Sequence, residues 1–169
     1  FTLLDELSSE YDLFDCLRET PEKSTCLLQK KADSSFALLK VAYGSKREHL
    51  QLEYDILRSI HSPLLPQAIS CSSDDKNTYF LREYIAGTPI SDFVERQGPF
   101  READAVRLCL DVCDALLVLH AQNPPVIHRD IKPQNVIYTQ QRTLALIDFD
   151  AARRYQNTQK KDTVYLGTQ

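Results

Sequence analysis

Glycine is scarce in this chain of 169 residues, which contains only Gly44, Gly87, Gly98 and Gly167. None of the four precedes Gly44. Because glycine has no Cβ, it lets a loop bring its backbone amides close to a bound phosphate. The first third of the chain therefore has no glycine-rich phosphate loop.

Disulfide and zinc patterns are also missing. The five cysteines are an odd number and form no C-x-x-C pair, which favours reduced thiols and a cytoplasmic location over a disulfide framework or a zinc site. Cys109 and Cys113 lie one helical turn apart. We expect them to be small apolar residues on the packed face of a helix rather than metal ligands.

The chain lacks a basic excess and a long apolar run. Its net charge is −4 and its pI is near 5.6, so we expect no nucleic-acid partner. No apolar stretch reaches the length of about 18 residues that a membrane span needs, and no signal-peptide pattern opens the chain. The hydrophobic and charged fractions, 43% and 26%, are typical of a globular protein of one large domain or two small lobes. The oligomeric state has no sequence signal.

The first part of the chain is typical of a small sheet with one helix. Apolar stretches at 10–19, 24–31 and 35–43 predict three strands in an antiparallel meander, because short polar turns join them. Two further strands are predicted near 66–72 and 78–85. Between the meander and these two strands, 45–61 is predicted to be a helix with a capping box of Ser45 and Glu48 and an apolar face of Leu52, Ile56, Leu57 and Ile60.

The second part opens with the polar break "AGTPIS" and then has the longest helical pattern, over 100–120. We expect its packed stripe to consist of Val106, Leu110, Cys113, Leu117 and His120. Short apolar runs then alternate with charged loops. One of these runs, Leu144–Ile147, predicts a buried strand that ends at Asp148.

The segment "HRDIKPQN", His128 to Asn135, places a carboxylate, a lysine and an amide on a loop that proline keeps from being helical. It resembles the catalytic loop H-R-D-x-x-x-x-N of the eukaryotic-type (Hanks-type) serine/threonine protein kinase family. Asp148 falls where that family has the aspartate of D-F-G, and Lys40 in "FALLKVA" resembles the lysine of its third strand. The matches follow one another in the family's order along nearly the whole chain.

This resemblance, bacterial-looking in character, implies an α+β fold. We expect an N-terminal lobe at 1–85, with a five-stranded antiparallel sheet and one helix, and a hinge with a partial, mostly helical C-terminal lobe at 86–169. The chain stops before the family's A-P-E signature. The implied activity is ATP-dependent, Mg²⁺-assisted phosphoryl transfer to Ser/Thr hydroxyls of a protein substrate by the complete protein, with little turnover by this piece alone.

The resemblance also implies roles for individual residues. Asp130 would accept or orient the proton of the attacking hydroxyl, and Lys132 would stabilise the transferring phosphoryl group. Asn135 and Asp148 would supply the oxygen ligands that Mg²⁺ prefers. Lysine at position 132 favours serine or threonine as the acceptor.

Further roles concern ATP. Lys40 would hold the α- and β-phosphates, fixed by an ion pair with a helix glutamate. We choose Glu53 over Glu48, because Glu53 lies on the core-facing stripe of the predicted helix. "FLREYIAG" resembles the hinge strand, so adenine would meet the carbonyl of Glu83 and the amide of Ile85. Ile137 would line the floor of the pocket.

Other family positions concern regulation. Arg129 beside the catalytic aspartate is typical of kinases whose activation loop is held by a phosphorylated residue, with Thr158, Thr163 and Tyr165 as candidates. Thr168 resembles the threonine that contacts the catalytic loop, and His128 is expected to fix the loop rather than act as a base.

Four departures from the family pattern weaken the expected grip on ATP. "RETPEKS" stands where the glycine-rich loop belongs, and its proline removes an amide donor. Leu38 replaces a small residue, Arg82 occupies the gatekeeper position, and Asp150 replaces the glycine of D-F-G. We expect Asp150 to stiffen its turn or to add a weak outer contact to the metal.

Two alternatives stay open. A small-molecule phosphotransferase of the aminoglycoside or choline kinase type often has a second acid after the metal aspartate, as "IDFD" has here. A pseudokinase, a binding module without catalysis, is favoured by the missing glycine loop, Leu38 and Arg82. The joint presence of Lys40, Glu53, Asp130, Asn135 and Asp148 opposes it.

Overall fold

The structure is a computed structural model that describes residues 5–155, with side chains from Leu7 onward. The contacts divide the chain into two compact units. The first comprises residues up to Arg58 together with Gln67–Tyr84, and the second comprises Ser59–Pro66 together with residues from Ile85 onward.

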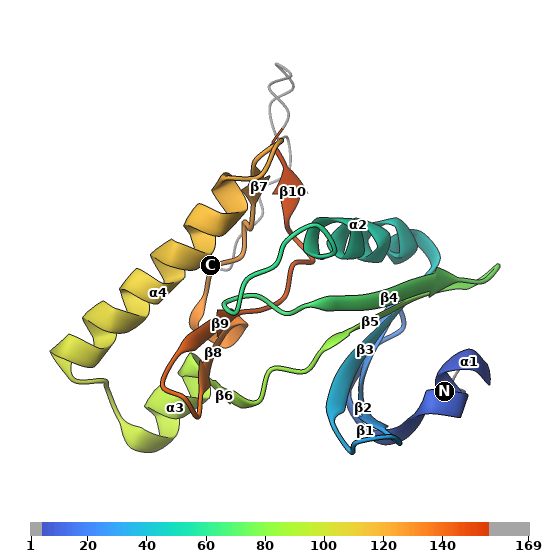
Figure 1. Ribbon diagram of the computed structural model, residues 1–169, viewed down its shortest axis with the longest axis horizontal. Helices are drawn as coiled ribbons and strands as arrows, with labels where there is room; N and C mark the ends of the chain where they lie inside the picture. Colours follow the sequence, from blue (N-terminus) through green and yellow to red (C-terminus); the bar gives the residue numbers. More distant parts are fainter. Residues whose placement is uncertain (1–4, 156–169) are drawn as a thin grey trace. The chain divides into compact units, whose positions relative to one another are not determined.

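The first unit is built on a five-stranded antiparallel sheet, as predicted (Figure 1). Its strand order is β1-β2-β3-β5-β4, and the first three strands form the expected meander. The strands are β1 (Tyr11–Glu19), β2 (Lys23–Lys30), β3 (Phe36–Tyr43), β4 (Ala68–Ser73) and β5 (Asn77–Glu83). The α+β fold class is therefore confirmed for this part of the chain.

Each face of this sheet packs against a helix, and only one of the two helices was expected. On one face, a cluster of buried side chains from β2, β3 and β5 includes Cys26, Leu28 and Leu39, and Leu7 of the short helix α1 (Asp5–Glu10) packs against it. On the other face lies α2 (Arg47–Leu57), where the rings of Tyr54 and Phe80 meet edge to face at 5.6 Å.

The start of α2 differs from the prediction. A 3-10 turn, η1 (Gly44–Lys46), precedes the helix, and Gly44 adopts the left-handed φ of 54° that glycine tolerates. The N-cap position of α2 is Lys46, which makes no side-chain cap hydrogen bond. The expected capping box of Ser45 and Glu48 is therefore wrong, because Ser45 lies inside the 3-10 turn.

The buried face of α2 also differs in part. It consists of Leu50, Glu53, Ile56 and Leu57. Leu52 is only half-buried, and Ile60 is buried beyond the end of the helix. The one acidic side chain on this face is Glu53.

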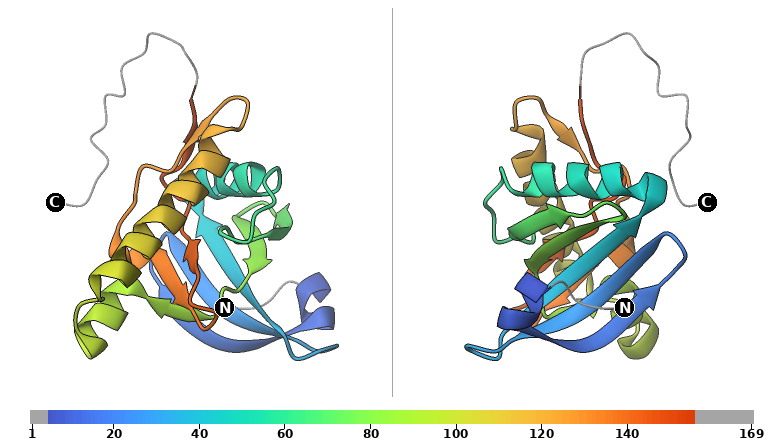
Figure 2. Two further views of the ribbon diagram at one scale, coloured as in Figure 1. Left: turned by 60° about the vertical axis from the view of Figure 1, so that its left-hand side comes forward. Right: turned by 90° about the vertical axis from the view of Figure 1, so that its right-hand side faces the viewer.

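In the part of the second unit that the structure describes, up to Tyr155, there are two α-helices and several short strands. The ribbon views of Figure 2 show these elements in yellow-green to red. A three-stranded sheet has the order β6-β8-β9, and β7 pairs with β10. The elements are β6 (Gly87–Pro89), α3 (Ile90–Gln97), α4 (Glu102–His120), β7 (Val126–Ile127), η2 (Pro133–Asn135), β8 (Val136–Thr139), β9 (Leu144–Leu146) and β10 (Arg153–Arg154). The sequence predicted only a break where β6 and α3 begin.

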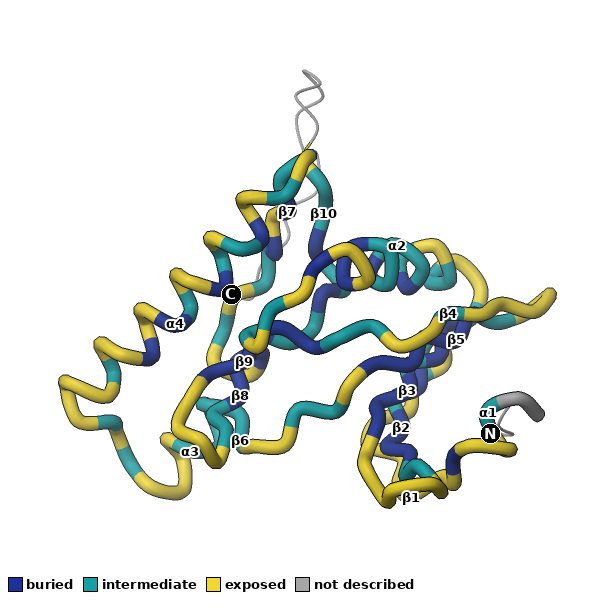
Figure 3. The backbone as a smooth tube through the Cα atoms, in the orientation of Figure 1, coloured by how far each residue is buried: buried dark blue, intermediate teal, exposed yellow. Residues whose placement is uncertain are grey.

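The packed stripe of α4 is not the predicted one. Val106, Leu110 and Leu117 are 53%, 56% and 65% exposed, and Cys109 and Cys113 are exposed as well. The helix instead buries Leu108, Asp111, Ala115 and Leu119, which are the dark positions along α4 in Figure 3. The helix carries two apolar stripes, and helical periodicity alone does not say which one faces β7 and β9. The expectation that both cysteines lie on the packed face is therefore wrong.

No helix among residues 5–155 is both long enough and apolar enough to cross a membrane.

Candidate active site

Lys40 and Glu53 form an ion pair within the first unit. Nζ of Lys40 lies 2.7 Å from Oε1 and 3.0 Å from Oε2 of Glu53. The side chain of Glu53 is fully buried and that of Lys40 is 13% exposed. Alternation along β3 turns Lys40 toward the face of the sheet that packs against α2, and Glu53 occupies the buried stripe of α2. The alternative glutamate, Glu48, is exposed.

A second cluster lies on the loop that ends in η2, within the second unit. Nδ2 of Asn135 donates to Oδ2 of Asp130 at 2.9 Å and to its carbonyl oxygen at 3.0 Å. Nζ of Lys132 lies 2.9 Å from the same Oδ2. The loop therefore brings together the three residues that the sequence predicted as catalytic, and it holds one oxygen of Asp130 from two sides.

The short strand β9 anchors this loop. The amide of Ile147 donates to the carbonyl of Asn135 at 2.8 Å, and Nε2 of His128 lies 3.3 Å from the carbonyl of Ile147. The ring of His128 also meets that of Phe149 edge to face at 4.7 Å. Both rings are buried. His128 thus lies at the base of the loop, in contact with backbone and an aromatic ring.

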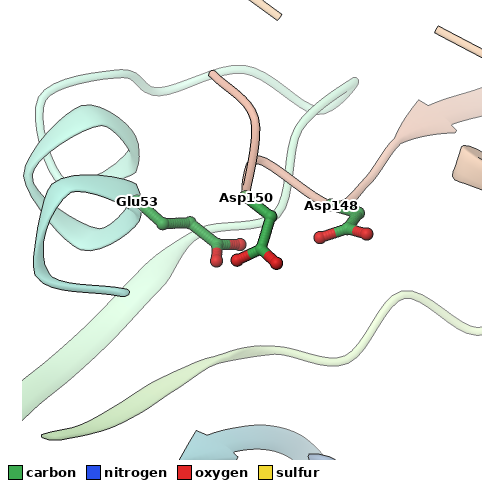
Figure 4. Close-up of side chains that lie close together, drawn as sticks. All are labelled: Glu53, Asp148 and Asp150. Carbon is green, nitrogen blue, oxygen red and sulfur yellow. The ribbon is translucent and has the colours of Figure 1, made fainter. Parts of the chain in front are cut away.

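Asp148 and Asp150 follow β9 on one loop of the second unit, and Figure 4 shows both side chains as sticks. A carboxylate oxygen of Asp148 lies within 4.8 Å of one from Asp150, and both residues are half-buried. Asp148 has φ of 64°, in the left-handed region, whereas Asp150 is not among the described non-glycine residues with positive φ. The left-handed backbone is therefore at Asp148 and not at Asp150, where the family has glycine.

Arg129 connects the predicted catalytic loop to the segment after β9. Its Nε donates to the carbonyl of Ala151 at 2.8 Å, and its own φ of 69° is left-handed. Neither this contact nor the packing of Phe149 on His128 was predicted from the sequence. For the packing of Phe149 on His128, the sequence did hold a signal, because Phe149 is an aromatic residue between Asp148 and Asp150. The predicted regulatory residues Thr158, Thr163, Tyr165 and Thr168 lie outside the described residues.

Among the residues expected near adenine, the carbonyl of Glu83 is already hydrogen-bonded within the protein. Arg82 is 4% exposed, lies opposite Leu38 across β5 and β3, and donates from Nη1 to the carbonyl of Glu83 at 3.1 Å. The carbonyl predicted to meet adenine therefore already accepts a hydrogen bond from the gatekeeper side chain. Ile137 is buried on β8, and Ile85 is the first residue of the second unit's main segment.

The turn between β1 and β2 is closed by its own hydrogen bonds. The amide of Thr20 donates to the carbonyl of Lys23 at 2.8 Å, and the amide of Lys23 donates to Oγ1 of Thr20 at 3.0 Å. Pro21 has no amide to donate. These amides are thus engaged within the turn that stands in place of a glycine-rich loop.

The protein kinase domain family matches residues 24–169, so this chain belongs to that family. The recognised motifs of the catalytic loop and of the third strand fall inside this match. The resemblance seen in the sequence is therefore confirmed.

Several curated relatives are similar to the chain. The cAMP-dependent protein kinase catalytic subunit of Dictyostelium discoideum is 30% identical over 137 residues, 78% of this chain and 21% of that protein. Serine/threonine-protein kinase cds1 of Schizosaccharomyces pombe is 34% identical over 72% of this chain and 26% of its own length. Dual specificity protein kinase zakA of Dictyostelium discoideum is 32% identical over 78% and 16%. The chain thus spans about a quarter or less of these relatives.

Proposed function

We propose that this chain supplies the ATP-binding and catalytic-loop part of a serine/threonine protein kinase, which transfers the γ-phosphoryl group of ATP to a protein hydroxyl with the help of Mg²⁺. The observation that carries the proposal is the joint hold of Asn135 and Lys132 on Asp130. Membership of the protein kinase family and the names of the relatives support it.

Asp130 is the group that receives the substrate hydroxyl. Asn135 and Lys132 both engage Oδ2, which leaves Oδ1 to accept the hydroxyl proton and to align the attacking oxygen. The side chain of Lys132 is 31% exposed. Its ammonium group would lie next to the transferring phosphoryl group and would stabilise the negative charge that develops there. Phosphoryl transfer depends mainly on such positioning and charge stabilisation, because the protein takes little part in covalent chemistry.

The donor set fits a magnesium ion. Asn135 is buried and turns Nδ2 to Asp130, so its Oδ1 is the atom with lone pairs to offer a cation. Two carboxylates within 4.8 Å, those of Asp148 and Asp150, repel each other when both are ionised. Asn135 and Asp148 would hold the ion, with Asp150 as an outer contact. When bound, Mg²⁺ neutralises phosphate charge and orients the γ-phosphoryl group.

Lys40 would bind the α- and β-phosphates, and Glu53 fixes its ammonium group in place. Adenine would lie against Ile137 and the backbone of Glu83 and Ile85. For the Glu83 carbonyl to take part, Arg82 has to release it or share it.

The test uses the complete protein with Mg-ATP and a mixture of serine, threonine and tyrosine peptides, and in separate reactions choline or an aminoglycoside in place of the peptides. We expect phosphate on serine or threonine, and a rate loss of about 100-fold or more in Asp130→Asn. Asp114→Asn, at an exposed acid of α4, is the matched control and should keep full activity. Transfer only to choline or an aminoglycoside would establish the small-molecule reading instead.

A binding module without catalysis is the second candidate, because the turn between β1 and β2 closes on itself and contains Pro21. A thermal-shift titration of the complete protein separates the two. Stabilisation by Mg-ATP that disappears in Asp148→Asn supports the kinase. No shift with nucleotide, or a shift of equal size in Asp148→Asn without metal dependence, supports the binding module.

A further inference from the structure

Two of the cysteines face each other across β1 and β2. Cys16 and Cys26 are register partners in the antiparallel pair, and their Sγ atoms lie 3.7 Å apart. Both thiols are free in the structure. Cys16 is exposed, whereas Cys26 has no exposed surface and belongs to the core cluster under α1.

Their positions suit a covalent link. Residues directly opposite in an antiparallel pair have Cα atoms about 4.5–5.5 Å apart, and disulfides span Cα distances of about 4.4–6.8 Å. Rotation about the Cα–Cβ bonds is therefore enough to bring the two sulfur atoms together. We propose that Cys16 and Cys26 form a reversible intramolecular disulfide when the protein meets a hydroperoxide.

The exposure of the two thiols sets the order of the steps. Hydroperoxide reaches Cys16, whose thiolate attacks the peroxide oxygen and becomes a sulfenic acid, while the O–O bond breaks and alkoxide or hydroxide leaves. The sulfur of Cys26 then attacks the sulfur of Cys16. The S–S bond forms, the S–O bond breaks, and the leaving hydroxide takes the proton of Cys26 to give water.

The buried thiol is suited to this second step only. Burial, with a smaller contribution from the Cys16 thiol beside it, raises the pKa of Cys26 to about 12. Cys26 is therefore protonated at neutral pH and is a poor first nucleophile. Its place beside the Cys16 sulfur makes it the resolving thiol.

The link would restrain the hairpin turn. Cys16 and Cys26 flank the turn that Thr20 and Lys23 close. A disulfide at an exposed edge strand is open to thiols, so reduction can reverse it. Oxidation would thus switch the mobility of the hairpin that stands where the family's phosphate loop belongs.

Cys109 and Cys113 provide an internal control. Both are exposed on α4, one helical turn apart. Residues at this spacing have Cβ atoms about 5–6 Å apart, whereas a disulfide needs about 3.5–4.5 Å. Exposure alone would favour this pair, and cross-strand geometry favours Cys16 with Cys26.

The experiment treats the complete protein with hydrogen peroxide, blocks the remaining thiols and maps the peptides without reduction. We expect the thiol count to fall by two, a loss of two hydrogen atoms in a peptide pair that joins Cys16 to Cys26, and full reversal by dithiothreitol. Amide exchange at Thr20 and Lys23 should slow on oxidation. A Cys109–Cys113 link formed first, or cross-links only between molecules, would overturn the proposal.

Two variants test the assigned steps. Cys16→Ser, at an exposed position, should keep the fold by circular dichroism and lose the cross-link. Cys26→Ala should stop the reaction at the sulfenic acid of Cys16, which dimedone traps. Absence of that adduct while the wild-type protein still forms the cross-link would contradict the order of steps. These measurements need no nucleotide, so their results do not depend on whether the proposed kinase activity is correct.

Discussion

The ammonium group of Lys40 lies 2.7 Å from Glu53, whose side chain is completely buried in the first unit. A buried carboxylate is stable only while a partner compensates its charge, because removal from water is costly. The pair therefore links the strand β3 to the helix α2, and it also fixes the lysine that is proposed to bind phosphate. One contact serves both stability and function.

Replacing Lys40 should destabilise the protein strongly. We expect Lys40→Ala to lower the free energy of unfolding by about 3–5 kcal/mol, because Glu53 stays buried after its ion pair with Lys40 is lost. Urea unfolding of the 169-residue chain measures this loss of stability. Adding Glu53→Leu should recover much of the loss, since no charge then remains buried.

The surface pair of Lys46 and Glu22 is the matched control. Their charged atoms lie 3.9 Å apart, and the two side chains are 33% and 62% exposed. Lys46→Ala should change stability by about 1 kcal/mol or less. An effect of Lys40→Ala as small as this one would show that Glu53 is compensated in another way.

The left-handed backbone of Asp148 separates two substitutions of this residue. Asparagine tolerates a φ of 64° as aspartate does, so Asp148→Asn should stay within about 0.5 kcal/mol of wild type. Alanine in this conformation costs about 1–2 kcal/mol. Both variants should lose Mg²⁺-dependent binding of nucleotide in calorimetry. Retained metal dependence in both would remove Asp148 as a ligand.

Asp150 gives a weaker expected effect. Its backbone does not need glycine, so Asp150→Gly should lower stability by about 0.5–1 kcal/mol through added chain entropy. We expect Mg-nucleotide affinity to fall a few-fold, because one carboxylate near Asp148 is lost. Unchanged affinity and activity in the complete protein would argue against both roles given to Asp150.

The elements that the sequence predicted well are those with a local signal. The strands β1, β2 and β3 are apolar stretches separated by short polar turns, and the residues of the predicted catalytic loop are close together in the chain. The packed face of α4 has no comparable local signal, because its tertiary partners decide which of its apolar stripes is buried. The ion pair of Lys40 and Glu53 joins distant segments, and only the family resemblance pointed to it.

His128 should matter for stability and not for proton transfer. It is 1% exposed and packs on Phe149. His128→Ala should cost about 2–4 kcal/mol through a cavity and lost hydrogen bonds. The pH dependence of the remaining turnover should keep its shape, since the ring contacts backbone rather than substrate. His120→Ala, exposed at the end of α4, is the control and should be near neutral. Loss of one limb of the pH profile would make His128 a proton carrier.

Leu117 and Leu119 lie two residues apart on α4, and truncating them to alanine should change the free energy of unfolding by very different amounts. Leu119 has no exposed surface, so Leu119→Ala should lower the unfolding free energy by about 2–5 kcal/mol. Leu117 is 65% exposed, so Leu117→Ala should change it by about 0.5 kcal/mol or less. Urea unfolding of the 169-residue chain measures both. A larger loss in Leu117→Ala than in Leu119→Ala would mean that the stripe predicted from periodicity, and not the observed one, faces the core.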